Sequence, residues 1–156
     1  MPLEVIRVTT SEEFEIAKRL RYEVFALQLG FDPAQDLDKY DFMDTTVHLI
    51  GRDVETNEYV AVARCLVDPA KREAKIGRVG VLTKFQCRGY GGLIIAAIHR
   101  AVQARCDTIS LGAMPDKVGF YRRLGYVRIN DGTFFDDNGV ELCWMIKNLD
   151  DNNTES

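Results

Sequence analysis

The feature that most constrains this chain is a strand that runs into a glycine-rich turn and continues as a helix, over Val79 to Gly92. Three glycines, Gly89, Gly91 and Gly92, stand where that helix is predicted to begin. A helix N-terminus exposes unpaired N–H groups and carries partial positive charge, so a turn without side-chain bulk lets an anionic group lie directly on it. The turn therefore predicts an anion-binding site, although glycines at a tight turn without a ligand explain the same residues equally well.

Two familiar nucleotide-binding patterns are absent from this turn. A dinucleotide-binding fingerprint needs a third glycine three places after Gly91, where Ile94 stands, and it belongs to a parallel strand–helix–strand unit that is not expected here. A phosphate-binding P-loop needs Gly-Lys-Ser or Gly-Lys-Thr, and the sequence contains neither. Both patterns are therefore excluded.

Hydrophobic periodicity predicts an α/β fold, with a mixed, mostly antiparallel central sheet flanked by helices. A Thr10–Glu13 capping box should open a first helix that stops at Gly30, and the acidic stretch 31–45 that follows should be a loop. Strands are expected at 3–9, 46–52, 59–67, 75–82, 108–112, 126–129 and 140–146, the last two as a hairpin. Further helices are expected at 91–105 and 115–125.

Length and composition predict one domain. The chain has 156 residues, of which 46% are hydrophobic, enough for one continuous core. We expect the domain to span 1–147 and the polar residues 148–156 to be a disordered tail. Cys65, Cys87, Cys106 and Cys143 have neither zinc-ligand nor disulfide-framework spacing, so we expect no metal and a reducing compartment.

Charge and hydropathy limit the location and the partners of the protein. The formal net charge of −4 should repel a phosphate backbone, so nucleic acid is not an expected partner. Glu4 and Arg7 interrupt the first ten residues, and no apolar run reaches the ~18 residues of a membrane span, so neither a signal peptide nor membrane association is expected. A cytoplasmic location follows, and a nuclear one is compatible with the same features.

The turn resembles motif A of the GNAT acetyltransferase superfamily, because Gln86 to Gly91 reads Gln-x-x-Gly-x-Gly and lies five residues after Val81. The resemblance implies a GNAT fold with acetyl-CoA as co-substrate and no metal. It also implies that the loop binds the CoA pyrophosphate and that the preceding strand pairs with the pantetheine arm. The implied cofactor-binding residues are Val79, Gly80, Val81, Gln86, Cys87, Arg88, Gly89, Tyr90, Gly91 and Gly92.

A second match lies about 30 residues further on, where Gly119 to Tyr126 looks like the family's F-Y-x-x-x-G-F segment. The resemblance implies that Tyr121 lies beside the CoA sulfur as general acid; a tyrosine whose ring packs in the core is the alternative. Other residues resemble the small ElaA-type branch: Arg21, Val24-Phe25, Gln35 to Asp38, Asp41, His48, Ala63-Arg64 and Ile76 to Val79. Gln28-Leu29 stands where that branch usually has Glu-Gln, which leaves the acceptor open. Met114 stands where many GNATs place an Asn, which leaves one pantetheine contact open.

Three further residues are candidates for binding the acceptor. His48 is the histidine expected on a strand that lines the cleft, where it could act as general base or simply be held by a hydrogen bond, with water removing the proton instead. Arg64 and Arg78 stand in otherwise apolar strands, where an unpaired arginine is costly. They could neutralise the acidic loop or bind an anionic group of the acceptor. His99 lies off the apolar stripe of its helix and is expected to face solvent.

The sequence therefore predicts an acyltransferase: an N-acetyltransferase that moves the acetyl group from acetyl-CoA to a primary amine of a small molecule, by direct attack in a ternary complex. A protein or amino sugar phosphate acceptor, similar to glucosamine 6-phosphate, is an alternative. From another class comes a non-catalytic GNAT module that only binds acyl-CoA. A homodimer is compatible with the sequence.

Overall fold

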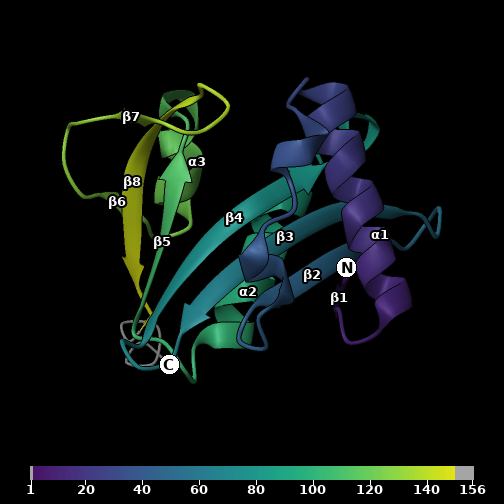
Figure 1. Ribbon diagram of the computed structural model, residues 1–156, viewed down its shortest axis with the longest axis horizontal. Helices are drawn as coiled ribbons and strands as arrows, with labels where there is room; N and C mark the ends of the chain where they lie inside the picture. The colour runs from purple at the N-terminus through teal and green to yellow at the C-terminus, as the bar shows by residue number, and fades with distance from the viewer. Residues whose placement is uncertain (1, 150–156) are drawn as a thin grey trace.

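The computed structural model describes residues 2–149, which form an eight-stranded sheet with helices on both faces (Figure 1). The strand order is β1-β2-β3-β4-β5-β8-β6, and β7 pairs with β8. The strands are β1 (Leu3–Arg7), β2 (Val47–Asp53), β3 (Tyr59–Asp68), β4 (Glu73–Val81), β5 (Thr108–Ala113), β6 (Val127–Arg128), β7 (Phe134–Phe135) and β8 (Glu141–Asn148). Neighbouring strands are antiparallel except β4 and β5, which confirms the predicted mixed sheet.

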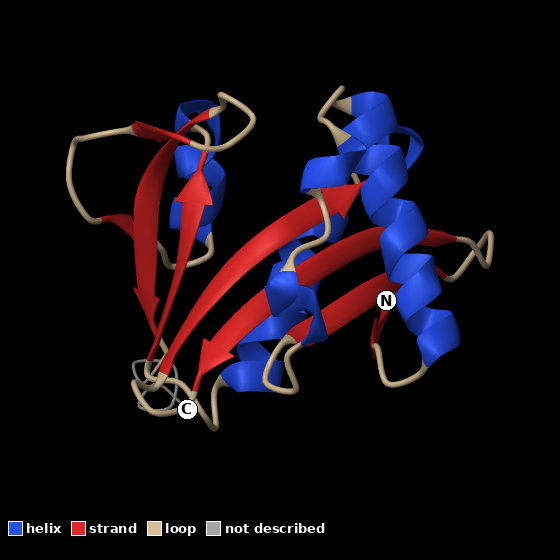
Figure 2. Ribbon diagram, viewed as in Figure 1, coloured by secondary structure: helices blue, strands red, loops and turns tan. Residues whose placement is uncertain are grey.

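The helices divide between the two faces of the sheet (Figure 2). On one face lies α1 (Ser11–Arg21), which opens with the predicted Thr10–Glu13 capping box and continues as a π-helix, η1 (Tyr22–Gln28). On the other face lie α2 (Tyr90–Val102) and α3 (Val118–Arg123). Short 3-10 turns complete the chain: η2 (Pro33–Gln35), η3 (Lys39–Phe42), η4 (Thr83–Phe85) and η5 (Pro115–Lys117).

Alternation along the central strands supplies a core to each face. Ile50 of β2 packs with Ala17 and Leu20 of α1, whereas its neighbour Leu49 belongs to the core beneath α2. Successive strand residues point to opposite faces, so a strand covered on both sides is apolar throughout. The apolar runs at 46–52 and 59–67 are explained by this burial on both faces.

Several boundaries differ from the prediction. The predicted final hairpin is short, because β6 pairs with β8 over only two residues and β7 pairs with β8 over two more. Strand β8 runs to Asn148 and Leu149 is buried, so the ordered chain passes the boundary predicted at 147. Residues 150–156 of the predicted tail lie outside the described part of the chain.

The prediction that His99 faces solvent is wrong. Its ring is half-buried, and Nε2 lies 2.7 Å from the hydroxyl of Tyr126, a hydrogen bond between α2 and the segment that follows α3. Burial, together with the charges of Lys147 and Arg100, lowers the pKa of His99 to about 4. The imidazole is therefore neutral at pH 7, and Tyr126, a distant partner in the sequence, explains a position that helical periodicity alone would place outside the core.

Candidate active site

The site lies where β4 and β5 separate (Figure 1). The two parallel strands pair only from Glu73 to Ile76 on β4. Beyond that point β4 holds one residue more than the stretch of β3 opposite it, and Arg78 has φ +53. An extra residue of this kind is a β-bulge, which bends its strand. The bend opens a pocket of about 640 Å³ whose walls include Val79 of β4, Leu111 of β5 and Tyr121 of α3.

The predicted anion-binding turn follows the end of β4 and lies against α3, where Gly91 faces the ring of Phe120. Helix α2 begins at Tyr90, and Gly89, with φ +81, is its N-cap. The first hydrogen bond of the helix runs from Leu93 N to Gly89 O at 3.2 Å, so the amides of the preceding residues have no acceptor within the helix. Gln86 holds the turn on β4, because its side-chain amide donates to Val81 O at 3.0 Å. The turn can therefore present several N–H groups to one anion.

Tyr90 takes part in this turn through its backbone. Its side chain is buried, and its hydroxyl donates a hydrogen bond to Asp53, which is also buried and also accepts from Thr56. That contact anchors the first residue of α2 to the end of β2. Sequence reasoning missed Asp53. The only signal was Tyr90, which stands between two glycines at the start of an apolar helix: a buried tyrosine hydroxyl needs a partner, but the sequence does not say which residue supplies it.

Helix α3 lies against the start of α2. A Cβ atom built on Gly91 would stand 3.5 Å from the ring of Phe120, an ordinary contact distance. Tyr121, the next residue, packs edge-on against Phe120 and Tyr126, with centroids 5.0 and 5.9 Å away. Burial raises the pKa of Tyr121, so the phenol stays protonated at pH 7 and can donate a proton or a hydrogen bond into the pocket.

The stretch 31–45 is held by an ion-pair cluster that begins with Arg21. This guanidinium is 1% exposed, and it contacts both carboxylate oxygens of Asp41, at 2.7 and 3.1 Å. Its Nε donates to Asp36 at 3.0 Å. Such bidentate pairs are the favourable geometry for a buried charge. Sequence reasoning placed Arg21 only in a family resemblance, because nothing local indicates that its partners lie 15 and 20 residues away.

Arg64 and Arg78 join the same cluster. Arg64 donates to Asp38 at 2.8 Å and to Asp41 at 3.1 Å. Arg78 donates to the Asp36 carbonyl at 2.9 Å and pairs with the carboxylates of Asp36 and Asp38 at 3.3 and 3.4 Å. Both arginines line the pocket, and these contacts support the alternative in which they neutralise the acidic loop. Their role in acceptor binding stays a prediction.

His48 of β2 lies next to this cluster. Its Nε2 is 3.0 Å from the carbonyl oxygen of Asp41, and its ring packs edge-on against Phe14 at 5.1 Å. Burial lowers the pKa of His48, so the ring is neutral at pH 7. These contacts support the structural alternative, and the role of general base stays a prediction. Across residues 2–149 no group of three or more His, Cys, Asp or Glu side chains is placed to hold a metal ion, and no helix is long and apolar enough to cross a membrane.

The buried carboxylate of Asp41 gives a stability prediction. Burial by itself would raise its pKa, but hydrogen bonds from Arg21 and from the Asp38 amide, with the charges of Arg21 and Arg64, hold the pKa below its usual range. Asp41→Asn removes one of the two carboxylates that pair with the buried Arg21 guanidinium. We therefore expect the free energy of unfolding, measured by urea denaturation, to fall by about 3 kcal/mol. Asp44→Asn, an exposed change in the same loop, is the matched control.

The sign of the pH dependence follows from the depressed pKa. The stabilisation from Asp41 is present above about pH 4, the ordinary carboxyl value, and is lost as pH falls through the folded-state value. Asp41→Asn should lack this acid-sensitive component. A variant whose stability matches that of Asp44→Asn at pH 7 would contradict the role of the cluster.

Comparison with known proteins identifies the class. The model of the acetyltransferase (GNAT) family matches residues 13–126, which include both the turn at the start of α2 and the Tyr121 segment. The chain therefore belongs to the GNAT acetyltransferase family and is an acyltransferase. It is also similar to the uncharacterised protein YyaT of Bacillus subtilis, with 23% identity over 154 residues that cover 97% of this chain and all of that protein.

Solved structures share the fold. Escherichia coli ElaA superposes with a TM-score of 0.79 at 22% identity, covering 93% of this chain and 99% of that one. An acyl-CoA N-acyltransferase of Pseudomonas aeruginosa gives 0.76 at 25% identity, with the same coverage. An aminoglycoside 6′-N-acetyltransferase solved with coenzyme A gives 0.68 at 16%, covering 92% of this chain and 97% of that one. The predicted GNAT fold is confirmed.

Proposed function

We propose that this protein transfers the acetyl group of acetyl-CoA to a primary amine of a small molecule. The observation that carries the proposal is that one pocket, opened by the bulge in β4, is bordered by Val79 and Tyr121, and that Gly91 of the anion-binding turn lies against Phe120, the residue before Tyr121. The family resemblance places the pantetheine arm at Val79, the sulfur at Tyr121 and the pyrophosphate at the turn. The similar fold of an aminoglycoside acetyltransferase solved with coenzyme A supports the same placement.

Acetyl-CoA would enter from the side of the turn. The amides of Cys87 to Gly92 would hold its pyrophosphate, with Cys87, Arg88 and Gly89 all exposed there. The separated end of β4, Val79 to Val81, has no β5 partner and so offers backbone groups to the pantetheine. The acceptor would enter from the opposite side, between η1 and the stretch 31–40.

The reaction would then be a direct attack. The neutral amine nitrogen bonds to the thioester carbonyl carbon, the carbon–sulfur bond breaks, and the CoA thiolate takes a proton from the Tyr121 hydroxyl. The proton lost by the amine passes to water, and the Tyr121 phenolate regains a proton from the solvent. Tyr121 can fill this role because it lines the pocket and its phenol, whose pKa burial raises, carries its proton at pH 7.

A thiol-release assay with acetyl-CoA across a panel of primary amines tests the proposal. We expect release of free CoA that depends on the amine, with the acetylated amine identified by mass spectrometry. Thermal stabilisation by acetyl-CoA without turnover on any amine would contradict an enzymatic role and favour a non-catalytic acyl-CoA-binding module.

A further inference from the structure

The charges that line the pocket are not all paired. Three guanidinium groups, those of Arg21, Arg64 and Arg78, are matched by the three carboxylates of Asp36, Asp38 and Asp41. This cluster has little capacity left for the charge of a ligand, because its members already neutralise one another. A ligand anion would need a different cation in the same pocket.

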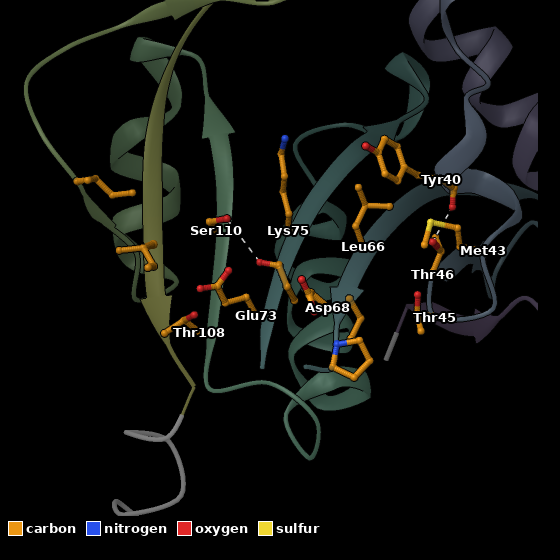
Figure 3. A pocket seen from close by; sticks show the side chains of 15 residues that line it. Tyr40, Met43, Thr45, Thr46, Leu66, Asp68, Glu73, Lys75, Thr108 and Ser110 are labelled. Carbon is orange, nitrogen blue, oxygen red and sulfur yellow. Dashed lines mark hydrogen bonds between the residues drawn. The ribbon is translucent and has the colours of Figure 1, made fainter. Parts of the chain in front are cut away.

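Lys75 is such a cation. It projects from β4, two residues before the widened end of the strand, and its ammonium points away from the carboxylates of Glu73 and Asp68 (Figure 3). Across residues 2–149 no carboxylate lies within 4.0 Å of that ammonium. Partial desolvation lowers the pKa of Lys75, and the positive charges of Arg64 and Arg78 lower it further. An anion bound here would relieve that repulsion.

An aromatic wall lies beside the ammonium of Lys75. Its ammonium stands 4.8 Å from the centre of the Trp144 ring, which in turn stacks on Phe134 with centroids 4.7 Å apart. A second pocket, of about 780 Å³, lies along the same face of the sheet and shares Tyr40, Leu66 and Lys75 with the first (Figure 3). Lys75 therefore stands where the pocket that Tyr121 lines meets this second hollow.

We propose that Lys75 binds an anionic group, a carboxylate or a phosphate, carried by the acceptor itself. The inference rests on the proposed function. Because Lys75 and Tyr121 line one pocket, an anion on the ammonium would lie in the same cavity as the amine that attacks the thioester. The apolar surface of Trp144 and Leu66 would hold the body of the molecule. The acceptor class is an amine with an acidic group and an apolar body, such as an apolar amino acid.

Paired acceptors test this assignment. We expect kcat/KM for leucine or phenylalanine to exceed that for the corresponding amino acid amide by 10- to 100-fold, the range of a charge-assisted hydrogen bond. Glucosamine 6-phosphate against glucosamine is the second pair, and it distinguishes a phosphate from a carboxylate as the preferred group. The KM for acetyl-CoA should be the same with every acceptor.

Variants identify the residue responsible. Lys75→Met should remove the preference for the acidic member of the pair while the KM for acetyl-CoA stays unchanged, and Lys75→Arg should restore part of the preference. Lys71→Met, an exposed lysine in the turn before β4, is the matched control and should behave as wild type. Lys75 is itself exposed to the hollow, so its substitution should not prevent folding.

The outcomes separate the two proposals. Equal acetylation of acidic and neutral partners by the wild type, or a preference that survives Lys75→Met, would overturn the role of Lys75 and leave the transferase intact. Failure of every amine in the panel to release CoA would instead contradict the proposed function.

Discussion

Tyr121→Phe is expected to lower kcat about 10²-fold while the affinity for acetyl-CoA stays near that of the wild type. The substitution keeps the ring, with its edge-on contacts to Phe120 and Tyr126, and deletes only the hydroxyl. Because the thiolate would then have to be protonated by water, the loss should fall on the chemical step. Steady-state kinetics with acetyl-CoA and the best amine of the panel measure it.

Tyr126→Phe is the control for this variant. It removes a hydroxyl from the same aromatic group, but one that bonds to His99 within the core. We expect it to lower the free energy of unfolding and to leave kcat within about twofold of wild type. If Tyr121→Phe also keeps kcat within that range, Tyr121 is structural and another group protonates the thiolate.

Gly91→Val is expected to abolish the thermal stabilisation that acetyl-CoA confers. Wild-type protein should gain about 2.7 kcal/mol at a ligand concentration one hundred times Kd. A valine in the first turn of α2 would place two methyl groups where the pyrophosphate needs to approach the amides. The fold should tolerate the change, because the backbone of Gly91 is not in the left-handed region and a Cβ there makes an ordinary contact with Phe120. Differential scanning fluorimetry with and without acetyl-CoA measures the difference.

Ala104→Val is the matched control, since it adds the same β-branched side chain at an exposed position just past the C-terminal end of α2. Its shift with acetyl-CoA should equal that of the wild type. A folded Gly91→Val protein that keeps the full shift would remove the turn from the CoA site.

The acidic stretch 31–45 illustrates a limit of sequence reasoning. Its lack of periodicity and its crowded aspartates correctly predict irregular structure, and the sequence offers Arg64 and Arg78 as partners for it in one of two alternatives. It does not offer Arg21, the most buried member of the cluster. Arg21 belongs to the cluster because α1 packs across the sheet beside that stretch. No pattern of nearby residues encodes this arrangement.

Features that depend on neighbours along the chain can be predicted from the sequence. The capping box at Thr10 and Glu13, the alternation of the strands and the glycines of the α2 turn are set by local backbone geometry, and local residues report them. The order of these elements and two motifs at the family's separation were then enough to indicate the class. Which charges are satisfied becomes visible only once the chain is folded. Whether Arg78 is neutralised, Lys75 left without a carboxylate, or the Tyr90 hydroxyl bonded to Asp53 depends on side chains brought together from distant segments. Electrostatic and hydrogen-bond energies depend on distance in space, which the linear spacing of residues does not contain.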